Sequence, residues 1–484
     1  KINGSSTSGT VTGTGGNVTF NINQSTQSFT LAATTSNTSA TIPLTAVPPN
    51  AGDGLSFSKS LNFTYQSGPG LPASFLASAE QIINGSGTVT GGVVDLFTVS
   101  LGASDTISPY STAQLASTNP GAGPDVDFPN DLVFDGNGDM LIANGGAGSP
   151  DLGNFACIPA GAITTGANAA TVLTSGLDDP LGVAFGADSS VDLDNGQLTT
   201  DDDVEFVLNG TYTAAAASRD TARTGNFAST GVTAIPTSAQ NPAGTYAEGL
   251  EDSSAGPSSK VVIIHPDGST QTITDPAIAH PEVAYDASNG QLVVISDGRA
   301  LATPDFTKSN IQFWNVTGAT PTKVKQIALT DDANGATVPA DGPGNIAVSA
   351  DGHVAVVALD ANGFAELNVY DNVSTSRAKI QSTLDYGAAD CATLTNFTYG
   401  GTTVSANVAN KLAWLSNSKL MVELYSQATH VATSSNGLYI YDITQTQAQS
   451  GCDSGSGGTD GGTTIKQTGF RNLSNAPLAA AFKP

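Results

Sequence analysis

Four polar residues occupy one equivalent position in a segment that recurs along the sequence. They are Asp131, Glu282, Asn345 and Lys411, and each stands three residues before an aromatic or apolar residue. If the segments wrap into a ring, equivalent positions surround one axis, and polar atoms from distant parts of the chain can face one another there. Two interpretations follow, a ligand site at the mouth of a central channel or a polar opening filled with water.

A second acidic group lies between residues 190 and 203. Its members are Asp192, Asp194, Asp201 and Asp203. The pattern DxDNG resembles the start of a calcium loop, but its glycine falls one residue early and no glutamate occupies the twelfth position. A looser Ca²⁺ site and a solvated acidic loop both remain open, and no other cofactor is expected.

The remaining reactive residues form no motif. The four histidines stand in different segments, and the sequence contains no GxSxG elbow, no P-loop and no dinucleotide fingerprint. No catalytic residue is therefore assigned. Of the three cysteines, Cys391 and Cys452 lie in Gly/Ser/Thr-rich stretches and are predicted to form a disulfide, with three unpaired thiols as the alternative. Cys157 lies in an apolar run and is predicted to be a buried thiol.

Candidate glycosylation sites of the type N-x-S/T recur along the chain. They are Asn17, Asn62, Asn84, Asn209, Asn315, Asn372, Asn396 and Asn472. Such sites carry glycans only in exported proteins of organisms that glycosylate them. Many would also arise by chance in a chain this rich in Asn, Ser and Thr.

The recurring segment predicts β-hairpins. Residues 129–144, 281–297, 343–359 and 410–425 each read as an apolar strand, a turn rich in Asp, Asn, Ser or Gly, and a second apolar strand. A second hairpin follows each one, for example in residues 261–273 and 311–329. Four strands per unit at regular spacing are typical of a β-propeller.

The ends of the chain predict how the ring closes. Residues 477–482, PLAAAF, repeat the first strand of the unit at residues 180–185, PLGVAF. A lone innermost strand would leave its backbone groups unpaired, so residues 73–127 are predicted to complete the blade begun by residues 477–484. The alternative is that the natural chain continues beyond Pro484. The spacing of the units then predicts six blades, with an insertion at about residues 190–258.

We therefore predict an all-β protein: a six-bladed β-propeller over residues 73–484 and a small N-terminal β domain over residues 1–70. The N-terminal part alternates polar and apolar residues with no helical period, as expected of an Ig-like β-sandwich or a strand-rich arm. The formal net charge of −26 argues against nucleic acid as a partner, and no stretch is long and apolar enough for a membrane span.

The repeated unit resembles the PxxxAFDxDGxLYVxx-like unit of the NHL-repeat, YncE-like and gluconolactonase-like propellers. The resemblance covers roughly residues 75–484 and is specific for the fold. It implies that Asp131, Glu282 and Asn345 could hold a divalent metal at the channel mouth, where the metal would polarise a lactone carbonyl. Against that implication, the glutamate is not in the usual first unit, and Lys411 would place a positive charge beside the metal.

For function, the sequence favours a secreted or cell-surface protein without catalysis, acting in structure, adhesion or surface assembly. The N-terminal domain could join a neighbouring copy or other surface proteins and glycans at a sheet edge. One alternative is a metal-dependent lactonase or esterase at the channel mouth. The other is a carbohydrate- or peptide-binding module that uses the insertion.

Overall fold

The computed structural model divides the chain into two compact units, Lys1–Leu71 and Pro72–Pro484. It describes residues 40–45, 58–63, 75–83, 89–114, 129–135, 138–145, 153–160, 170–177, 180–186, 190–195, 202–207, 219–222, 227–252, 259–298, 301, 305, 308–329, 338–339, 346–359, 365–370, 379–381, 396–399, 402–405, 407–426, 437–448 and 463–483. In the first unit these residues form one antiparallel hairpin, β1 (Ala40–Thr45) with β2 (Ser58–Phe63). The rest of the expected Ig-like domain lies outside the described residues.

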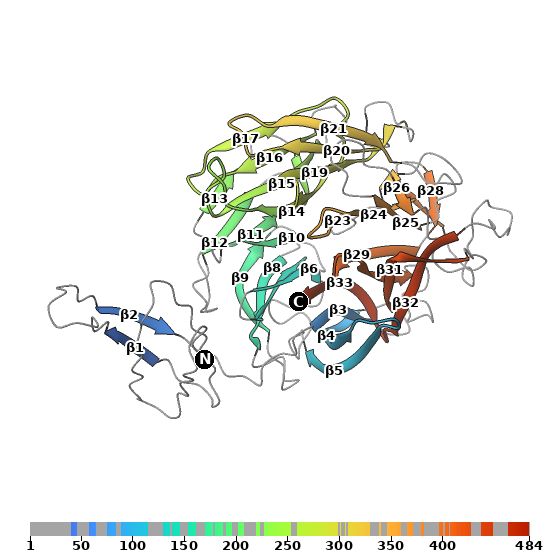
Figure 1. Ribbon diagram of the computed structural model, residues 1–484, viewed down its shortest axis with the longest axis horizontal. Helices are drawn as coiled ribbons and strands as arrows, with labels where there is room; N and C mark the ends of the chain where they lie inside the picture. Colours follow the sequence, from blue (N-terminus) through green and yellow to red (C-terminus); the bar gives the residue numbers. More distant parts are fainter. Residues whose placement is uncertain are drawn as a thin grey trace, which may run out of the picture. The chain divides into compact units, whose positions relative to one another are not determined.

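The second unit is built from antiparallel sheets arranged around a centre (Figure 1). The first three sheets in chain order have the strands β6 (Pro129–Phe134), β7 (Met140–Asn144), β8 (Gly153–Ile158), β9 (Thr171–Leu177); β10 (Pro180–Phe185), β11 (Ser190–Asn195), β12 (Asp202–Val207), β13 (Arg219–Ala222); and β14 (Phe227–Ile235), β15 (Thr245–Asp252), β16 (Lys260–Ile264), β17 (Thr270–Ile273).

The next sheets have the strands β18 (Glu282–Asp286), β19 (Gln291–Ser296), β20 (Asn310–Asn315), β21 (Thr322–Ala328); β22 (Val338–Pro339), β23 (Ile346–Val348), β24 (Val354–Leu359), β25 (Ala365–Tyr370), β26 (Lys379–Gln381); and β29 (Asn407–Trp414), β30 (Lys419–Ser426), β31 (Gly437–Ala448), β32 (Thr463–Asn472). The last sheet joins β33 (Ala476–Lys483) to β3 (Phe75–Ile83), β4 (Val89–Ser100) and β5 (Thr106–Gln114). A separate hairpin pairs β27 (Asn396–Tyr399) with β28 (Thr402–Ser405).

These sheets are the blades of a propeller. Their innermost strands contact one another in the order β33, β6, β10, β14, β18, β23 and β29, and β29 contacts β33 again. The circle of contacts closes, so no described blade has an innermost strand without a neighbour on each side. The all-β propeller predicted from the repeated hairpins is confirmed.

The ring holds one blade more than the sequence count of six. Residues 190–258, interpreted above as an insertion, instead supply strands β11 to β15. These strands end one blade and begin the next, because β13 pairs with β12 while β14 pairs with β15. The correction has a simple cause. The innermost strand β14 has the sequence FASTGVTAI, which lacks the proline and the terminal phenylalanine of PLGVAF. The repeat pattern therefore did not identify it as the first strand of a blade. The carbohydrate- or peptide-binding module that the sequence assigned to this segment stays a prediction.

The last strand completes the blade that the first strands of the propeller begin. β33 pairs with β3 in a register that places Ala480 opposite Ser78 and Ala479 opposite Ala79. Ala479 and Ala480 are buried. Small side chains on this innermost strand leave room for longer side chains from the strands beside it.

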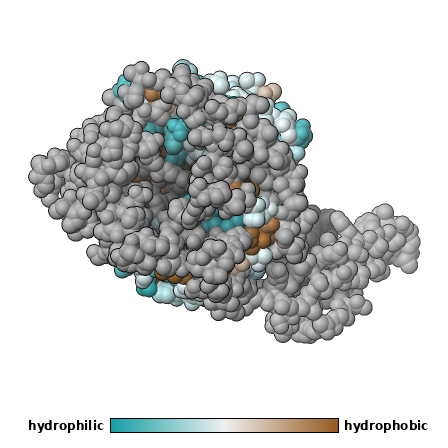
Figure 2. All heavy atoms as spheres, turned by 180° about the vertical axis from the view of Figure 1, so that it is seen from behind, coloured by the Kyte–Doolittle hydropathy of each residue, from teal (hydrophilic) through white to brown (hydrophobic). Residues whose placement is uncertain are grey.

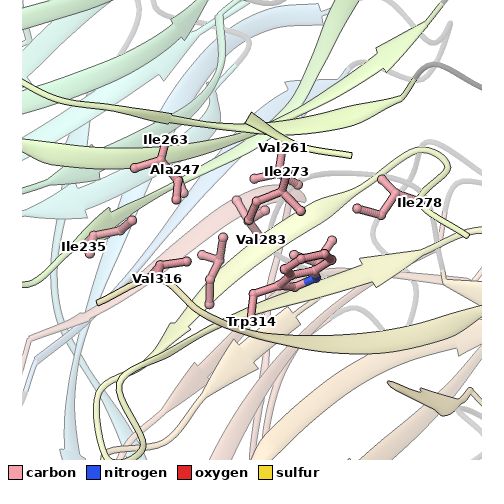
Figure 3. Packing of buried hydrophobic residues seen from close by; sticks show 11 residues of the cluster. Ile235, Ala247, Val261, Ile263, Ile273, Ile278, Val283, Trp314 and Val316 are labelled. Carbon is pink, nitrogen blue, oxygen red and sulfur yellow. The ribbon is translucent and has the colours of Figure 1, made fainter. Parts of the chain in front are cut away.

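Apolar side chains between neighbouring blades form the core. One cluster joins the β14–β17 sheet to the β18–β21 sheet through residues such as Val261, Val283 and Trp314 (Figure 3). Another joins the β29–β32 sheet to the sheet of β33, β3, β4 and β5 through residues such as Leu76 and Ile440. Full burial of one such side chain stabilises the fold by about 1.5–3 kcal/mol. Each blade face is therefore held by its neighbour.

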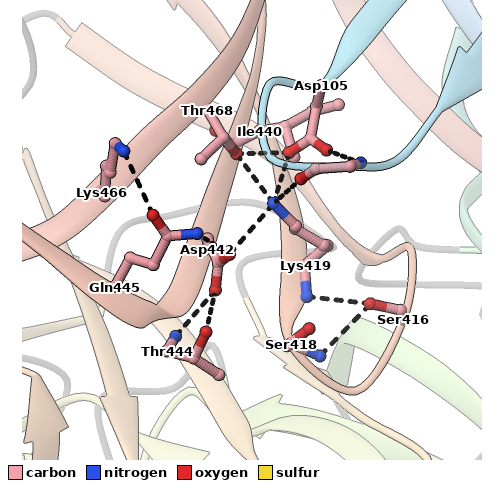
Figure 4. Close-up of polar contacts among 11 residues, drawn as sticks. Asp105, Ser416, Ser418, Lys419, Ile440, Asp442, Thr444, Gln445, Lys466 and Thr468 are labelled. Carbon is pink, nitrogen blue, oxygen red and sulfur yellow. Dashed lines mark hydrogen bonds and ion pairs between the residues drawn. The ribbon is translucent and has the colours of Figure 1, made fainter.

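A buried polar network also closes the ring, at the seam between these same two sheets (Figure 4). The Lys419 Nζ atom lies 2.8 Å from Asp105 Oδ2 and 3.1 Å from Asp442 Oδ2. Thr468 Oγ1 donates a hydrogen bond to Asp105 as well. Asp105 belongs to the β4–β5 turn, whereas Lys419 is the first residue of β30 and stands opposite Asp442 of β31. The network ties early residues to late ones.

Among the described residues, no helix has the length and apolar character needed to cross a membrane.

Candidate functional site

Two of the four residues predicted at the channel mouth meet. Lys411 Nζ on β29 donates a hydrogen bond to Asp131 Oδ1 on β6, and the two form an ion pair. In the ring, β33 lies between β29 and β6. The lysine side chain spans this strand, which is possible because β33 carries alanines at positions 479–481. The Lys411 side chain is 18% exposed and that of Asp131 is 8% exposed.

Asp131 is held in place by the backbone of two blades. Its Oδ1 atom accepts the N–H of Leu132 at 2.9 Å, and its Oδ2 atom accepts the N–H of Val183 on β10 at 3.2 Å. Oδ1 therefore accepts two donors, Lys411 and Leu132, whereas Oδ2 accepts one, and the carboxylate plane is fixed between β29 and β10. Hydrogen bonds to charged groups of this kind are the stronger ones in proteins.

Glu423 lies behind Lys411. In the β29–β30 register, Glu423 stands opposite Lys411, and its side chain is fully buried. Glu423 Oε1 accepts the hydroxyl of Ser78 at 2.8 Å, whereas Oε2 has no hydrogen-bond partner among the described residues. Burial raises the pKa of Glu423 to about 8, although the Ser78 hydrogen bond and the charge of Lys411 act in the opposite direction. Glu423 is therefore largely protonated at neutral pH.

Glu80 is the second buried carboxyl group of this region. It follows Ser78 by two positions on β3, so both side chains leave the same face of the strand. Glu80 Oε2 accepts the N–H of Asn475 at 3.2 Å, and Oε1 has no hydrogen-bond partner in the described part of the chain. Burial raises the pKa of Glu80 to about 9, with further contributions from the charges of Asp95 and Glu423.

These residues form one cluster that we call the channel-wall cluster. Its members are Ser78, Glu80, Asp131, Lys411 and Glu423. They come from three sheets of the ring, and only Lys411 and Asp131 have exposed side-chain surface among them. Figure 2 shows the face opposite to that of Figure 1, on which hydrophilic residues lie beside a hollow in the body of the propeller.

The other channel-mouth predictions have different outcomes. Glu282 is the first residue of β18 and is 2% exposed, but β10 and β14 separate its strand from β6, and β23 separates it from β29. It therefore lies on another part of the ring wall and does not join Asp131 and Lys411. Asn345 lies outside the described residues.

The residues of the channel-wall cluster do not fit a divalent metal. An ammonium group already occupies the carboxylate of Asp131, and a metal ion at that place would be repelled by it. The two buried glutamates each have an oxygen without a donor, but burial raises the pKa of both, so each would have to lose its proton before it could bind a metal. Within the described residues, no group of three or more His, Cys, Asp or Glu side chains could hold a metal.

Most of the acidic residues predicted to form a calcium site lie on β-strands. The backbones of Asp192 and Asp194 belong to β11, and Asp203 pairs with Asp194 from β12. The Asp192 side chain is fully buried. Asp201 lies outside the described residues, so the complete set stays a prediction. The backbone does not form the solvated loop that the sequence suggested, because these residues build a blade.

The cysteines and sequons are described only in part. Cys157 is a free thiol with no exposed surface, as expected from its apolar surroundings. Cys391 and Cys452 lie outside the described residues, and so do Asn17, Asn84, Asn209 and Asn372. Asn62 and Asn396 lie on β2 and β27, while Asn315 and Asn472 are exposed on β20 and β32.

Sequence reasoning missed Ser78, Glu80 and Glu423. A signal for the glutamates was present, since each is the one charged residue inside an apolar strand, as in FLASAE and LMVELY. Burying a carboxyl group costs free energy unless it is neutral or paired. A glutamate in an apolar strand is therefore a candidate for a functional site. The sequence pattern does not predict that these two strands, β3 and β30, lie close together.

The cluster combines three chemical abilities. The Lys411 ammonium can stabilise negative charge that develops on a carbonyl oxygen. Asp131 can accept a proton from a water molecule. Glu423 is protonated at neutral pH and therefore carries no negative charge. Asp131 is then the one carboxylate of the cluster that neutralises the Lys411 charge. Together these groups suit the hydrolysis of an activated carbonyl compound.

Comparison with known proteins gives structural likenesses alone. No protein-family model matches the sequence. No curated protein matches it either. Among solved structures, a putative 6-phosphogluconolactonase from Bacteroides uniformis is 13% identical with a TM-score of 0.51, over 85% of this chain and 100% of the other. The periplasmic gluconolactonase PpgL of Pseudomonas aeruginosa is 12% identical with a TM-score of 0.51, over 84% and 99% of the two chains.

Both structures are named as lactonases, and this contradicts the expectation of a structural or adhesive protein without catalysis. The expectation of a non-catalytic protein is therefore wrong, and the comparisons favour the lactonase alternative. At such low identity, the comparisons establish the fold. The chain has the β-propeller fold, which it shares with these two structures.

Proposed function

We propose that this protein hydrolyses a lactone, a cyclic ester, at the channel-wall cluster. The observation that carries the proposal is the ion pair between Lys411 and Asp131 across β33, backed by the protonated Glu423. The fold shared with two structures named as lactonases supports the choice of a lactone over other carbonyl compounds.

The proposed reaction uses the two partly exposed side chains directly. Asp131 accepts a proton from water while the water oxygen attacks the lactone carbonyl carbon. The Lys411 ammonium stabilises the negative charge that forms on the carbonyl oxygen. When the bond between this carbon and the ring oxygen breaks, Asp131 returns the proton to the ring oxygen. The product is a hydroxy acid, and one water molecule is consumed.

Glu423 and Ser78 act through Lys411. A neutral Glu423 does not compete with the carbonyl oxygen for the ammonium charge, whereas an ionised one would. The Ser78 hydroxyl keeps the Glu423 side chain opposite Lys411 through its 2.8 Å hydrogen bond. These two are positioning residues, and Glu80 adds a second neutral carboxyl group to the same wall.

The test is hydrolysis of glucono-1,5-lactone by the full chain, followed at constant pH by base titration with the spontaneous rate subtracted. Lys411→Met and Asp131→Asn should each lower kcat by about 100-fold or more, the usual range for an electrostatic or general-base group. Lys323→Met is the matched control, because Lys323 pairs with Asp275 at 2.6 Å on the outer strand β21, away from the innermost strands. Activity that survives Lys411→Met and Asp131→Asn at the wild-type rate would refute this site.

The role of metals is checked in the same assay. Because the cluster does not fit a divalent metal, treatment with a chelator should leave the rate unchanged. Loss of activity on chelation, restored by Ca²⁺, would show that a metal site outside the described residues performs the reaction.

Export of the protein to the extracellular space or cell surface also stays a proposal. Two sequon asparagines, Asn315 and Asn472, are exposed and so accessible to a glycosylating enzyme. A mass decrease of the native protein on deglycosylation would support export in an organism with that machinery.

A further inference from the structure

We infer that the channel-wall cluster takes an uncharged lactone and rejects a lactone that carries a phosphate group. The inference rests on the proposed function and specifies its substrate. The two similar structures are named for a phosphorylated and an unphosphorylated lactone respectively, so the names leave this choice open. The charges along the inner wall of the ring decide it.

Cations are scarce on the strands that line the channel. Across the innermost strands and the strands paired directly to them, the only basic residues in the described part of the chain are Lys411, Lys419 and Lys483. A protein site for phosphate uses Arg, Lys or unpaired backbone N–H groups, most often at a helix N-terminus. Among the described residues only Ala160 is α-helical, and its N–H already donates a hydrogen bond to Asp139 Oδ1 at 2.6 Å.

Two of these three lysines are already paired with a carboxylate. Lys411 pairs with Asp131. Lys419 pairs with Asp105 and Asp442 in the closing seam. Lys483, the last residue of β33, is the one further lysine on the described parts of these strands. At most one lysine is therefore left there to compensate a phosphate dianion.

Acidic residues are common on the same strands. Besides Asp131, the buried ones are Glu80, Asp192, Glu248, Glu282, Asp286 and Glu423. A phosphate near this wall would be repelled by those of these carboxyl groups that are ionised. The formal net charge of −26 adds a long-range repulsion that an uncharged substrate does not experience.

An uncharged sugar lactone fits the exposed part of the cluster. Lys411 can donate to the lactone carbonyl oxygen, and Asp131 can accept from water beside it. The hydroxyl groups of a sugar can both donate and accept hydrogen bonds, so they match carboxyl groups in either protonation state. A phosphate at neutral pH mainly accepts, and the wall offers it few donors.

The experiment compares kcat/KM for three freshly prepared substrates: glucono-1,5-lactone, its 6-phosphate, and its uncharged 6-O-methyl derivative. We expect the first and third to be hydrolysed at similar kcat/KM and the 6-phosphate at a value at least tenfold lower. Raising the salt from 20 to 500 mM should increase kcat/KM for the 6-phosphate alone, because salt screens charge repulsion.

The outcomes separate this inference from the proposed function. Equal or faster hydrolysis of the 6-phosphate would overturn the inference while leaving the lactonase proposal intact. Equal rejection of the 6-phosphate and the 6-O-methyl derivative would assign the discrimination to size and would also overturn it. Hydrolysis of none of the three would instead refute the lactonase proposal itself.

Discussion

Ser78 and Glu423 are 345 residues apart in the chain, yet the Ser78 hydroxyl donates to Glu423 Oε1 at 2.8 Å. Ser78 lies on β3, which pairs with the last strand, and Glu423 lies on β30 of the preceding blade. The contact therefore exists only when the ring is closed. It joins the closure of the propeller to the placement of the carboxyl group behind Lys411, so folding and the proposed catalysis depend on the same seam.

The stability of the protein should fall as pH rises from about 4.5 to about 9. Glu80 and Glu423 have pKa values raised by burial to about 9 and about 8 in the folded chain, from ordinary values of 4.5. Above pH 4.5 the unfolded chain releases these protons while the folded chain keeps them, so the unfolded state gains. Each unit of difference in pKa corresponds to about 1.4 kcal/mol as an upper limit.

Chemical denaturation at a series of pH values measures this effect. Glu80→Gln and Glu423→Gln replace each protonated carboxyl group by a neutral group of similar shape, so each should flatten the decline between pH 5 and pH 9. Asp95→Asn, a substitution at a neighbouring carboxylate that raises the Glu80 pKa, should flatten it in part. A wild-type stability that stays constant over this range would contradict the buried, neutral glutamates.

The proposed lactonase activity should decline as pH rises through about 8. Ionisation of Glu423 places a second carboxylate beside Lys411 and reduces the charge available to the carbonyl oxygen. In Glu423→Gln the group cannot ionise, so the alkaline decline should disappear while the rate at pH 6–7 stays within about threefold of wild type. The measurement is kcat/KM against pH for both proteins. An unchanged alkaline limb in the variant would assign the decline to another group.

Lys419→Met should destabilise the protein by about 3 kcal/mol or more. The substitution leaves the buried carboxylates of Asp105 and Asp442 without their cation, and breaking a buried ion pair on one side costs about 3–5 kcal/mol. The double variant Lys419→Met with Asp105→Asn should recover part of the loss, because one uncompensated charge is removed. Lys308→Met removes an exposed partner of Asp305 and should change the stability by less than about 1 kcal/mol. Comparable losses in Lys419→Met and Lys308→Met would mean that the seam network contributes little.

Cys157 should not react with iodoacetamide while the protein is folded. Its side chain has no exposed surface, and burial together with the charges of Asp139 and Asp135 raises the pKa of the thiol far above its ordinary value. The thiolate is the reactive form, so both access and ionisation oppose alkylation. Mass spectrometry of the peptide containing Cys157 should show labelling after denaturation only. Rapid labelling of the native protein would show that the β8 strand opens locally.

The sequence by itself determined the local structure and the way the ring closes. Alternating apolar strands separated by turns rich in Asp, Asn and Gly predict hairpins, because pairing between neighbouring strands depends on nearby residues. The likeness of PLAAAF to PLGVAF predicted that the last strand would be an innermost one, and β33 does pair with β3. Equal positions in the repeats also identified Asp131 and Lys411 as candidates for one wall.

Tertiary structure alone decided the number of blades and the membership of the site. β14 lacks the repeat pattern, yet it is an innermost strand, because it packs between the innermost strands β10 and β18. Glu282 shares its repeat position with Asp131 but stands on a distant blade, whereas Ser78, Glu80 and Glu423 share no repeat position and lie together. The position of a residue in the repeat predicts where it lies along its own strand. It does not predict which blades are neighbours or which side chains reach across β33. Packing between sheets that are far apart in the chain decides both.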